Sequence, residues 1–206
     1  MHKIYLVIAC MLMTFSATAT DVVDGEQYIT LNRQKTSTPQ ILEFFSFYCQ
    51  HCYDFEQIYQ VTHKIKKALP AETKIVRYHV GYLGLLGKPL TQAWAVAIAL
   101  GVEDKVSPLM FEAVQKAQTL KTSNDIRSVF VTAGISVSDY DAALNSSIVK
   151  NLVVKQEKAM QDFPLLGVPV VFVNGKYMVK NNGLDSSSIA RYAQQFVDVV
   201  QFLIGK

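Results

Sequence analysis

Cys49 and Cys52 are separated by two residues at the point where an apolar segment gives way to a helical pattern. Two cysteines at positions i and i+3 can close a small disulfide ring in the first turn of a helix. The first of them then lies near free backbone N–H groups and the positive end of the helix dipole, which stabilise an anion. We therefore expect Cys49 to ionise readily and to take part in dithiol–disulfide chemistry.

The third cysteine, Cys10, falls in a segment that resembles a secretory signal. The segment has Lys3 near its start, an apolar run over Ile4–Met13 and the small residues of Ala17–Ala19 as a cleavage site. The apolar run is too short to span a bilayer. A lipoprotein signal ending at Cys10 is disfavoured because the run continues past that cysteine. Cleavage near Ala19 would leave only two cysteines and lower the formal net charge from +3 to +2.

An exported chain with a single Cys-x-x-Cys pair does not use disulfides as a scaffold. A static disulfide over so short a loop removes little entropy from the unfolded chain, so we expect the pair to be reactive rather than structural. Zinc would need two further ligands, and the other histidines, His63 and His79, show no paired ligand spacing. We therefore expect no metal and no cofactor.

The composition is that of a folded protein that holds one sizeable domain or two small ones. The chain has 206 residues, of which 50% are hydrophobic and 18% charged. Its 20 Lys and Arg residues are scattered and face 17 Asp and Glu residues. Because no basic stripe is present, we expect no nucleic-acid partner.

The elements around the motif alternate between strand and helix. Alternation and apolar runs predict strands at Gln27–Leu31, Ile41–Phe45 and Lys74–Val80. The second of these is apolar throughout except for one glutamate, as in a central strand covered on both faces, and it leads into the cysteine motif. A stripe at spacings of three and four predicts one amphipathic helix over Phe55–Leu69.

The middle of the chain is helical. Gly81–Pro89 has the composition of a linker or turn, and helical periodicity then runs from Leu90 to about Phe163. The predicted helices cover Leu90–Leu100, Pro108–Leu120, Ile126–Phe130, Tyr140–Leu144 and Ile148–Met160. Since no strand interrupts this block, we expect a separate helical lobe.

Strands return at Val168–Val173 and Lys176–Val179, joined by Asn174-Gly175, a strong hairpin signal. A last helix begins near Ser186–Ser188. The order of elements predicts a thioredoxin-like α/β fold with an inserted all-helical domain. Its expected parts are the signal peptide 1–19, a thioredoxin-like domain in two segments, 20–81 and 149–206, and the helical insertion 82–148.

From about Gly25 to the end, the sequence resembles the DsbA family of bacterial periplasmic thiol oxidases. The matching segments are Cys49-Gln50-His51-Cys52, Leu90–Ala97, Gly101–Val106, Gly167–Pro169 and Phe172–Tyr177. The resemblance implies a thioredoxin-like fold, the periplasm of a Gram-negative bacterium as location, and donation of a disulfide to newly exported proteins. One departure is Gln50, where the family usually has a proline preset for a helix start, which leaves the redox potential open.

The resemblance assigns roles within the motif. A substrate thiolate attacks Cys49, a mixed disulfide forms, and Cys52 resolves it. His51 can donate a hydrogen bond or place a positive charge near the Cys49 thiolate, which stabilises the reduced form and makes the disulfide oxidising. The alternative for His51 is a solvated histidine at a helix start.

Glu43 interrupts the apolar strand, and a buried carboxyl is costly unless it is paired or protonated. In the family the matching glutamate pairs with a lysine beneath the active site, and the partner here is Arg77, which cannot release its proton. We expect Glu43 to transfer protons near Cys52, with a purely structural ion pair as the alternative. Glu56, which the family groups with this pair, also fits favourable charge in a first helical turn.

Pro169 opens a strand, where proline is tolerated. The resemblance implies a cis Val168–Pro169 bond that faces the cysteines, with the preceding backbone pairing with substrate peptide. It also matches Phe55, Tyr59, Ile189 and Tyr192 to residues that line the family's peptide groove. Each of these four also fits a helix core stripe.

The leading interpretation is a monomeric dithiol oxidase that is reoxidised by a quinone-linked inner-membrane partner of the DsbB kind. A disulfide reductase or isomerase is disfavoured, because isomerases of this fold carry a dimerisation domain for which no residues remain. The alternative from another class is a chaperone-like peptide-binding module with an incidental dithiol. Oxidation of a reduced unfolded protein separates these functions.

Overall fold

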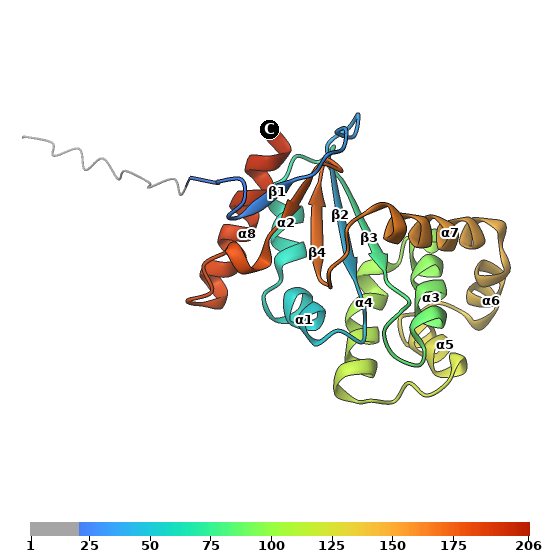
Figure 1. Cartoon of the computed structure of the whole chain (residues 1–206). Coiled ribbons are helices and arrows are strands. Elements are labelled where there is room, and N and C mark those ends of the chain that lie inside the picture. Colours follow the sequence, from blue (N-terminus) through green and yellow to red (C-terminus); the bar gives the residue numbers. More distant parts are fainter. Residues whose placement is uncertain (1–20) are drawn as a thin grey trace, which may run out of the picture.

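A computed structural model describes residues 21–206, so the expected signal peptide and its cleavage near Ala19 lie outside the described residues. A five-stranded sheet forms the centre of the molecule, with the strand order β1-β5-β4-β2-β3 (Figure 1). The strands are β1 (Tyr28–Thr30), β2 (Gln40–Phe45), β3 (Lys74–His79), β4 (Val170–Val173) and β5 (Tyr177–Val179). Only the β2–β3 pair is parallel within this sheet.

Strand β2 is the central strand that the apolar run predicted. It lies between β3 and β4, and all its residues after Gln40 are buried. Phe44 packs on one face with Phe172, and Ile41 packs on the other with Val171. Burial of both faces holds β2 rigidly, so its carboxyl end delivers the Ser46–Tyr48 turn and then Cys49 to a defined place.

The predicted single helix over Phe55–Leu69 is wrong. The structure has α1 (Gln50–Tyr53), a π-helical turn η1 (Asp54–Ile58) and a separate helix α2 (Val61–Ala68). Gln60 separates η1 from α2, because its backbone is in a left-handed conformation with φ +54°. Because a π turn adds a residue to the helical repeat, it rotates Ile58 off the buried stripe, and this side chain is 48% exposed.

The block predicted to be helical is helical in the structure, and it forms a lobe at one side of the sheet (Figure 1). It contains α3 (Gly87–Leu100), α4 (Glu103–Phe111), the π-helical turn η2 (Glu112–Lys116), α5 (Ser123–Thr132), α6 (Val137–Asn145) and α7 (Ser147–Asp162). Its core includes Trp94, Phe111 and Phe130, and is continuous with Phe45 and Phe47 from the end of β2. The lobe therefore packs directly against the segment that carries the cysteines.

Several helix boundaries in the lobe differ from the prediction. The helix expected from Pro108 begins at Glu103, where two acidic residues suit the positive end of the helix dipole, and its helical turns end at Lys116 instead of Leu120. The segment read as a linker to Pro89 becomes helical at Gly87. Pro89 is tolerated there because N–H groups in a first helical turn have no intrahelical acceptor.

The C-terminal part follows the predicted pattern. Asn174 and Gly175 both have positive φ, +52° and +65°, and turn β4 into β5. Strand β4 begins at Val170, two residues later than expected. Helix α8 (Ile189–Gly205) starts at Ser188, whose hydroxyl accepts a hydrogen bond from the Arg191 N–H. It packs with α2 in the core that contains Ile41 and Val171 (Figure 1). Among residues 21–206, no helix is long and apolar enough to cross a membrane.

Candidate active site

Cys49 is the N-cap residue of α1. Its Sγ accepts a hydrogen bond from the Cys52 N–H at 3.3 Å, and its thiol lies 3.1 Å from the carbonyl oxygen of Val168. Cys49 is half-buried and Cys52 is buried, and both are free thiols. The structure thus presents one accessible sulfur and one protected sulfur at the start of a helix.

The two thiols differ strongly in acidity. The hydrogen bond with the Cys52 side chain, the Cys52 backbone N–H and the charge of His51 together lower the pKa of Cys49 to about 6, although burial opposes them. Burial raises the pKa of Cys52 far above its usual range, and the hydrogen bond to Cys49 and the Cys49 charge add to this shift. At neutral pH the reduced site therefore holds a Cys49 thiolate beside a Cys52 thiol.

The low pKa of Cys49 predicts a pH-dependent difference in stability between the redox forms. A thiol whose pKa falls on folding contributes stability that is fully present above its unfolded pKa, near ~8.5, and lost as pH falls through about 6. The disulfide form has no such titration. We expect the reduced form to gain about 1 kcal/mol relative to the oxidised form between pH 5 and pH 7, after allowing for solvent screening at a half-buried group.

Urea unfolding of both forms from pH 5 to pH 7.5 measures this difference. Cys52 is neutral in the folded and unfolded states below about pH 8, so it does not distort the comparison. If the free energies of unfolding of the reduced and oxidised forms change with pH by the same amount over this range, Cys49 is not a thiolate.

His51 is exposed between the two cysteines, and its charge lowers the pKa of Cys49 less than the hydrogen bonds of Cys52 do. It also lines a cavity of about 430 Å³ beside the thiols. The cavity brings together the five residues matched to a peptide groove, Phe55, Tyr59, Val168, Ile189 and Tyr192, with Pro169.

These groove residues play different structural parts. Phe55 is 2% exposed and packs edge-on against Phe196, so it forms the floor of the cavity and belongs to the core. The rings of Tyr59 and Tyr192 pack edge to face with their centroids 5.6 Å apart, and Ile189 is half exposed at the rim. The floor is rigid, and the rim offers apolar surface to a ligand.

The Val168–Pro169 peptide bond is cis. The Pro169 carbonyl oxygen accepts a hydrogen bond from Asn181 Nδ2 at 2.8 Å. Asn181 also lines the cavity, and sequence reasoning missed it, since it lies in the short 3₁₀ turn η3 (Asn181–Gly183) outside any motif.

Glu43 and Arg77 form a buried ion pair beneath the cysteines. Arg77 Nε and Nη2 lie 3.0 and 3.3 Å from the two carboxylate oxygens of Glu43, and Nη1 lies 3.2 Å from Glu56 Oε1. Thr62 donates a further hydrogen bond to Glu43 at 3.1 Å. Burial raises the pKa of Glu43, and the neighbouring Glu56 charge adds to this, while the Arg77 charge opposes it.

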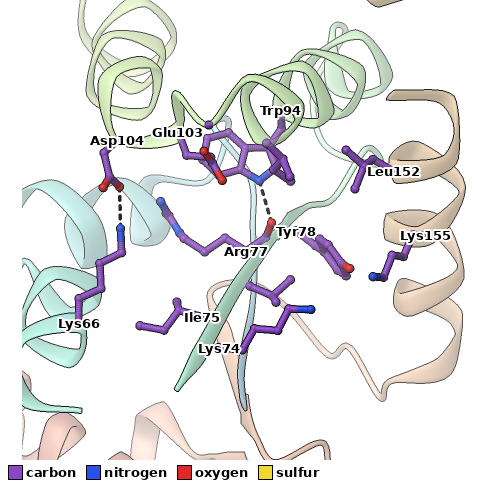
Figure 2. Close-up of a pocket in the computed structure, with 13 residues that line it drawn as sticks. Lys66, Lys74, Ile75, Arg77, Tyr78, Trp94, Glu103, Asp104, Leu152 and Lys155 are labelled. Atoms are coloured by element: carbon purple, nitrogen blue, oxygen red, sulfur yellow. Dashed lines mark hydrogen bonds and ion pairs between the residues drawn. The ribbon is translucent and has the colours of Figure 1, made fainter. Parts of the chain in front are cut away.

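Arg77 also joins this cluster to the helical lobe. Figure 2 shows its side chain beneath Trp94, whose Nε1–H donates a hydrogen bond to the Arg77 carbonyl oxygen at 2.8 Å. The guanidinium lies over the rings of Phe45 and Trp94. The cavity of about 330 Å³ in this view is closed on one side by the Lys66–Asp104 ion pair at 2.6 Å. Through its contact with Arg77 Nη1, Glu56 joins Glu43 and Arg77 in one cluster, as the resemblance implied.

A second buried polar residue, His79, was weighed in the sequence only as a metal ligand. The structure places it at the end of β3, where it contacts the turn before Cys49. No sequence pattern predicts this contact, because it depends on the parallel pairing of β2 with β3. Within residues 21–206, no three His, Cys, Asp or Glu side chains group into a metal site.

Comparisons with known proteins show which proteins this chain is similar to. Residues 40–195 match the family described as DSBA-like thioredoxin domain. The chain is 61% identical over 206 residues to the thiol:disulfide interchange protein DsbA of Dickeya dadantii, with all of both chains covered. It is 60% identical over 204 residues to the DsbA of Yersinia pestis, with 99% of each chain covered.

Solved structures show the same likeness. A complex of Proteus mirabilis DsbA with a non-covalently bound peptide, PWATCDS, superposes with a TM-score of 0.87 at 47% identity, covering 91% of this chain and 100% of that one. DsbA of Pseudomonas aeruginosa, at 23% identity and a TM-score of 0.73 over 91% and 99% of the two chains, shares the fold.

Proposed function

This chain belongs to the family of DsbA-like thioredoxin domains and is a thiol:disulfide oxidoreductase, and we propose that it oxidises exported proteins through a Cys49–Cys52 disulfide. The observation that carries the proposal is the asymmetry of the two thiols. Cys49 is half-buried with a pKa of about 6, whereas Cys52 is buried with a raised pKa. A dithiol with one stabilised thiolate favours its reduced form, so its disulfide is a strong oxidant.

The reaction proceeds in two exchanges. A substrate thiolate attacks Cys49 Sγ, the Cys49–Cys52 bond breaks, and its electron pair goes to Cys52, which takes up a proton because its pKa is raised. The resemblance implied that Cys52 resolves the mixed disulfide, but attack by Cys52 on Cys49 would only reverse the first exchange. In the forward direction a second substrate thiolate attacks the substrate sulfur of the mixed disulfide. Cys49 leaves as a thiolate, which its low pKa favours. The substrate loses two electrons and gains a disulfide, and the enzyme ends as the dithiol.

Glu43 is our candidate for the proton transfer at Cys52. Burial raises the pKa of Glu43, which allows it to hold a proton, and its charge is among the causes that raise the pKa of Cys52. Arg77 stays protonated and keeps the carboxyl in place. Glu56, which also binds Arg77, completes the cluster.

The cavity beside Cys49 is our candidate peptide groove. Its apolar wall, formed by Phe55, Tyr59, Ile189 and Tyr192, suits the side chains that flank a substrate cysteine. The Val168 backbone, whose carbonyl oxygen lies next to Cys49 Sγ, can pair with the substrate backbone in strand fashion, and Pro169 shapes this edge. The cysteine-containing peptide bound non-covalently by Proteus mirabilis DsbA supports a groove that accepts such a segment.

Replacing His51 by serine is expected to raise the Cys49 pKa and make the disulfide less oxidising, because a positive charge and a potential donor beside the thiolate are lost. We expect the equilibrium constant for oxidation of glutathione by the Cys49–Cys52 disulfide to fall roughly tenfold, which corresponds to a reduction potential about 30 mV more negative. Thiolate absorbance against pH measures the first effect. If the H51S thiol titrates where the parent thiol does, Gln50 or the backbone sets the potential and our role for His51 is wrong.

We further propose that the protein is a periplasmic monomer, exported after cleavage near Ala19 and reoxidised by a DsbB-like quinone-linked membrane oxidase. We retain the division into 20–81, 82–148 and 149–206, although α7 serves both domains. Val149, near its start, belongs to the core of the helical lobe, whereas Met160, near its end, packs on the sheet.

Oxidation of a reduced unfolded protein by the stoichiometric disulfide form tests the proposed function. We expect rapid disulfide formation, and none with a variant in which Cys49 and Cys52 are both alanine. Folding assistance that survives in this variant would favour a chaperone-like peptide-binding module. Reduction of insulin that outpaces oxidation of the unfolded protein would favour a reductase or isomerase.

A further inference from the structure

His79 makes hydrogen bonds with both ring nitrogens although it is completely buried. Its Nε2 accepts the Phe47 N–H at 3.2 Å and lies 3.4 Å from Ser46 Oγ. Its Nδ1 lies 2.9 Å from Thr91 Oγ1, on α3. The imidazole therefore bridges the turn that precedes Cys49 and the first helix of the lobe.

The direction of each hydrogen bond follows from chemistry. A backbone N–H can only donate, so the Phe47 N–H requires a lone pair on Nε2 of His79. The neutral ring then carries its proton on Nδ1 and donates it to Thr91 Oγ1, and the Thr91 hydroxyl donates to the Gly87 carbonyl oxygen at 3.2 Å. Burial lowers the pKa of His79 to about 3, which keeps the ring neutral at the pH where the enzyme acts.

The turn held by His79 is the one that places Cys49. Within it, the Tyr48 N–H donates to Ser46 Oγ at 3.2 Å, and the Cys49 N–H donates to the Ser46 carbonyl oxygen at 3.1 Å. Phe47 is 1% exposed, and its ring stacks on the imidazole with the two ring centroids 5.3 Å apart. A buried N–H without a partner costs about 1–3 kcal/mol, so losing the Nε2 acceptor would drive this turn to rearrange.

Gln156 of α7 closes the network on the other side. Its Oε1 accepts the His79 backbone N–H at 3.0 Å, and its Nε2 donates to the Thr91 carbonyl oxygen at 3.2 Å. Gln156 is fully buried. Two helices of the lobe, α3 and α7, thereby fix the position of β3 and of the His79 ring.

We propose that His79 is a positioning residue for the redox reaction: its Nε2 fixes the Ser46–Tyr48 turn so that Cys49 stays at the N-cap of α1, and Thr91 fixes the tautomer that makes this possible. His79 touches neither cysteine, and it acts through Phe47 and Ser46. The inference rests on the proposed role of Cys49 as the stabilised thiolate.

Three substitutions separate positioning from packing. His79→Phe keeps an aromatic ring but removes both polar contacts. His79→Asn can still reach Thr91 but not the Phe47 N–H, whereas His79→Gln can place an amide oxygen near the Nε2 position. We expect the Cys49 pKa to rise by about 0.5 to 1 in the Phe and Asn variants. The equilibrium constant with glutathione should fall about three- to tenfold in these variants and stay within about twofold of the parent in the Gln variant.

Thr91→Val and Phe130→Leu complete the set. Thr91→Val removes the acceptor that holds the tautomer and leaves the His79 ring in place, so it tests the same network even if the variants at position 79 fold poorly. We expect a shift of the Cys49 pKa in the same direction. Phe130→Leu loosens the buried core of the lobe away from the network and should leave the Cys49 titration unchanged.

Thiolate absorbance against pH and the equilibrium with glutathione are measured for all five variants, with urea unfolding as the measure of stability. The inference is overturned if the Cys49 pKa of His79→Phe and of Thr91→Val equals that of the parent. It is also overturned if the Cys49 pKa shifts as far in His79→Gln as in His79→Phe. An equal shift of the Cys49 pKa in Phe130→Leu, at a similar loss of stability, would overturn it too. A parent Cys49 that itself titrates near ~8.5 would overturn the proposed function as well.

Discussion

Replacing Cys52 by alanine is expected to turn the enzyme into a trap that remains disulfide-linked to exported proteins. Cys49 keeps its N-cap position and its half-buried thiolate, so it can still attack a disulfide of an exported protein, which breaks that disulfide and leaves the protein linked to Cys49. Without Cys52, no thiol of the enzyme can break this mixed disulfide, so it persists unless a second substrate thiolate reaches it. Extracts run on non-reducing gels should show adducts that disappear on treatment with a thiol, with turnover falling to the background rate.

Cys49→Ala is the matched control, because the remaining thiol, Cys52, is buried and its pKa is raised. We expect no adducts from this variant. Adducts from Cys49→Ala and none from Cys52→Ala would reverse the two roles. Absence of adducts from both variants would show that neither thiol exchanges with substrates.

Replacing Arg77 by methionine is expected to destabilise the protein by about 3–5 kcal/mol, because it leaves the Glu43 carboxyl buried without its countercharge. The carboxyl should then be protonated in the folded state. Since its folded pKa would lie further above the unfolded value, the loss of stability should be small below about pH 4 and grow as pH rises. Urea unfolding at pH 4 and pH 7 measures both effects.

A second substitution, Glu43→Gln in the Arg77→Met protein, should restore part of the lost stability, since a neutral amide costs less to bury than a carboxylate. Lys66→Ala removes the exposed Lys66–Asp104 pair and should cost under about 1 kcal/mol. If Arg77→Met costs no more than Lys66→Ala, the buried ion pair does not hold this part of the structure.

The sequence predicts the order of strands and helices along the chain and the place of the cysteines, because these depend on local patterns. The alternation in β3, the apolar run of β2 and the Asn174-Gly175 turn each carry a signal within a few residues. The break at Gln60 carries no such signal. Its left-handed backbone follows from the π-helical turn before it, and periodicity across Phe55–Leu69 reads as one continuous helix.

Contacts between distant segments explain the rest of what was missed. His79 reaches Phe47 only because β2 and β3 pair in parallel, with Phe45 beside His79. Neither residue lies in a sequence pattern that predicts this contact. The candidate groove residues were assigned by resemblance alone, because η1, the Val168–Pro169 segment and α8 meet at the cavity from three separate parts of the chain.

The reduction potential of the Cys49–Cys52 pair tests the central claim most directly, because it measures how far the folded protein favours the dithiol. Equilibration of the protein with glutathione redox buffers at pH 7 gives this value. Stabilisation of the Cys49 thiolate, with a pKa of about 6, predicts a potential less negative than about −180 mV, the range of disulfide-forming enzymes. A potential near about −270 mV, where the reductase thioredoxin lies, would contradict an oxidase.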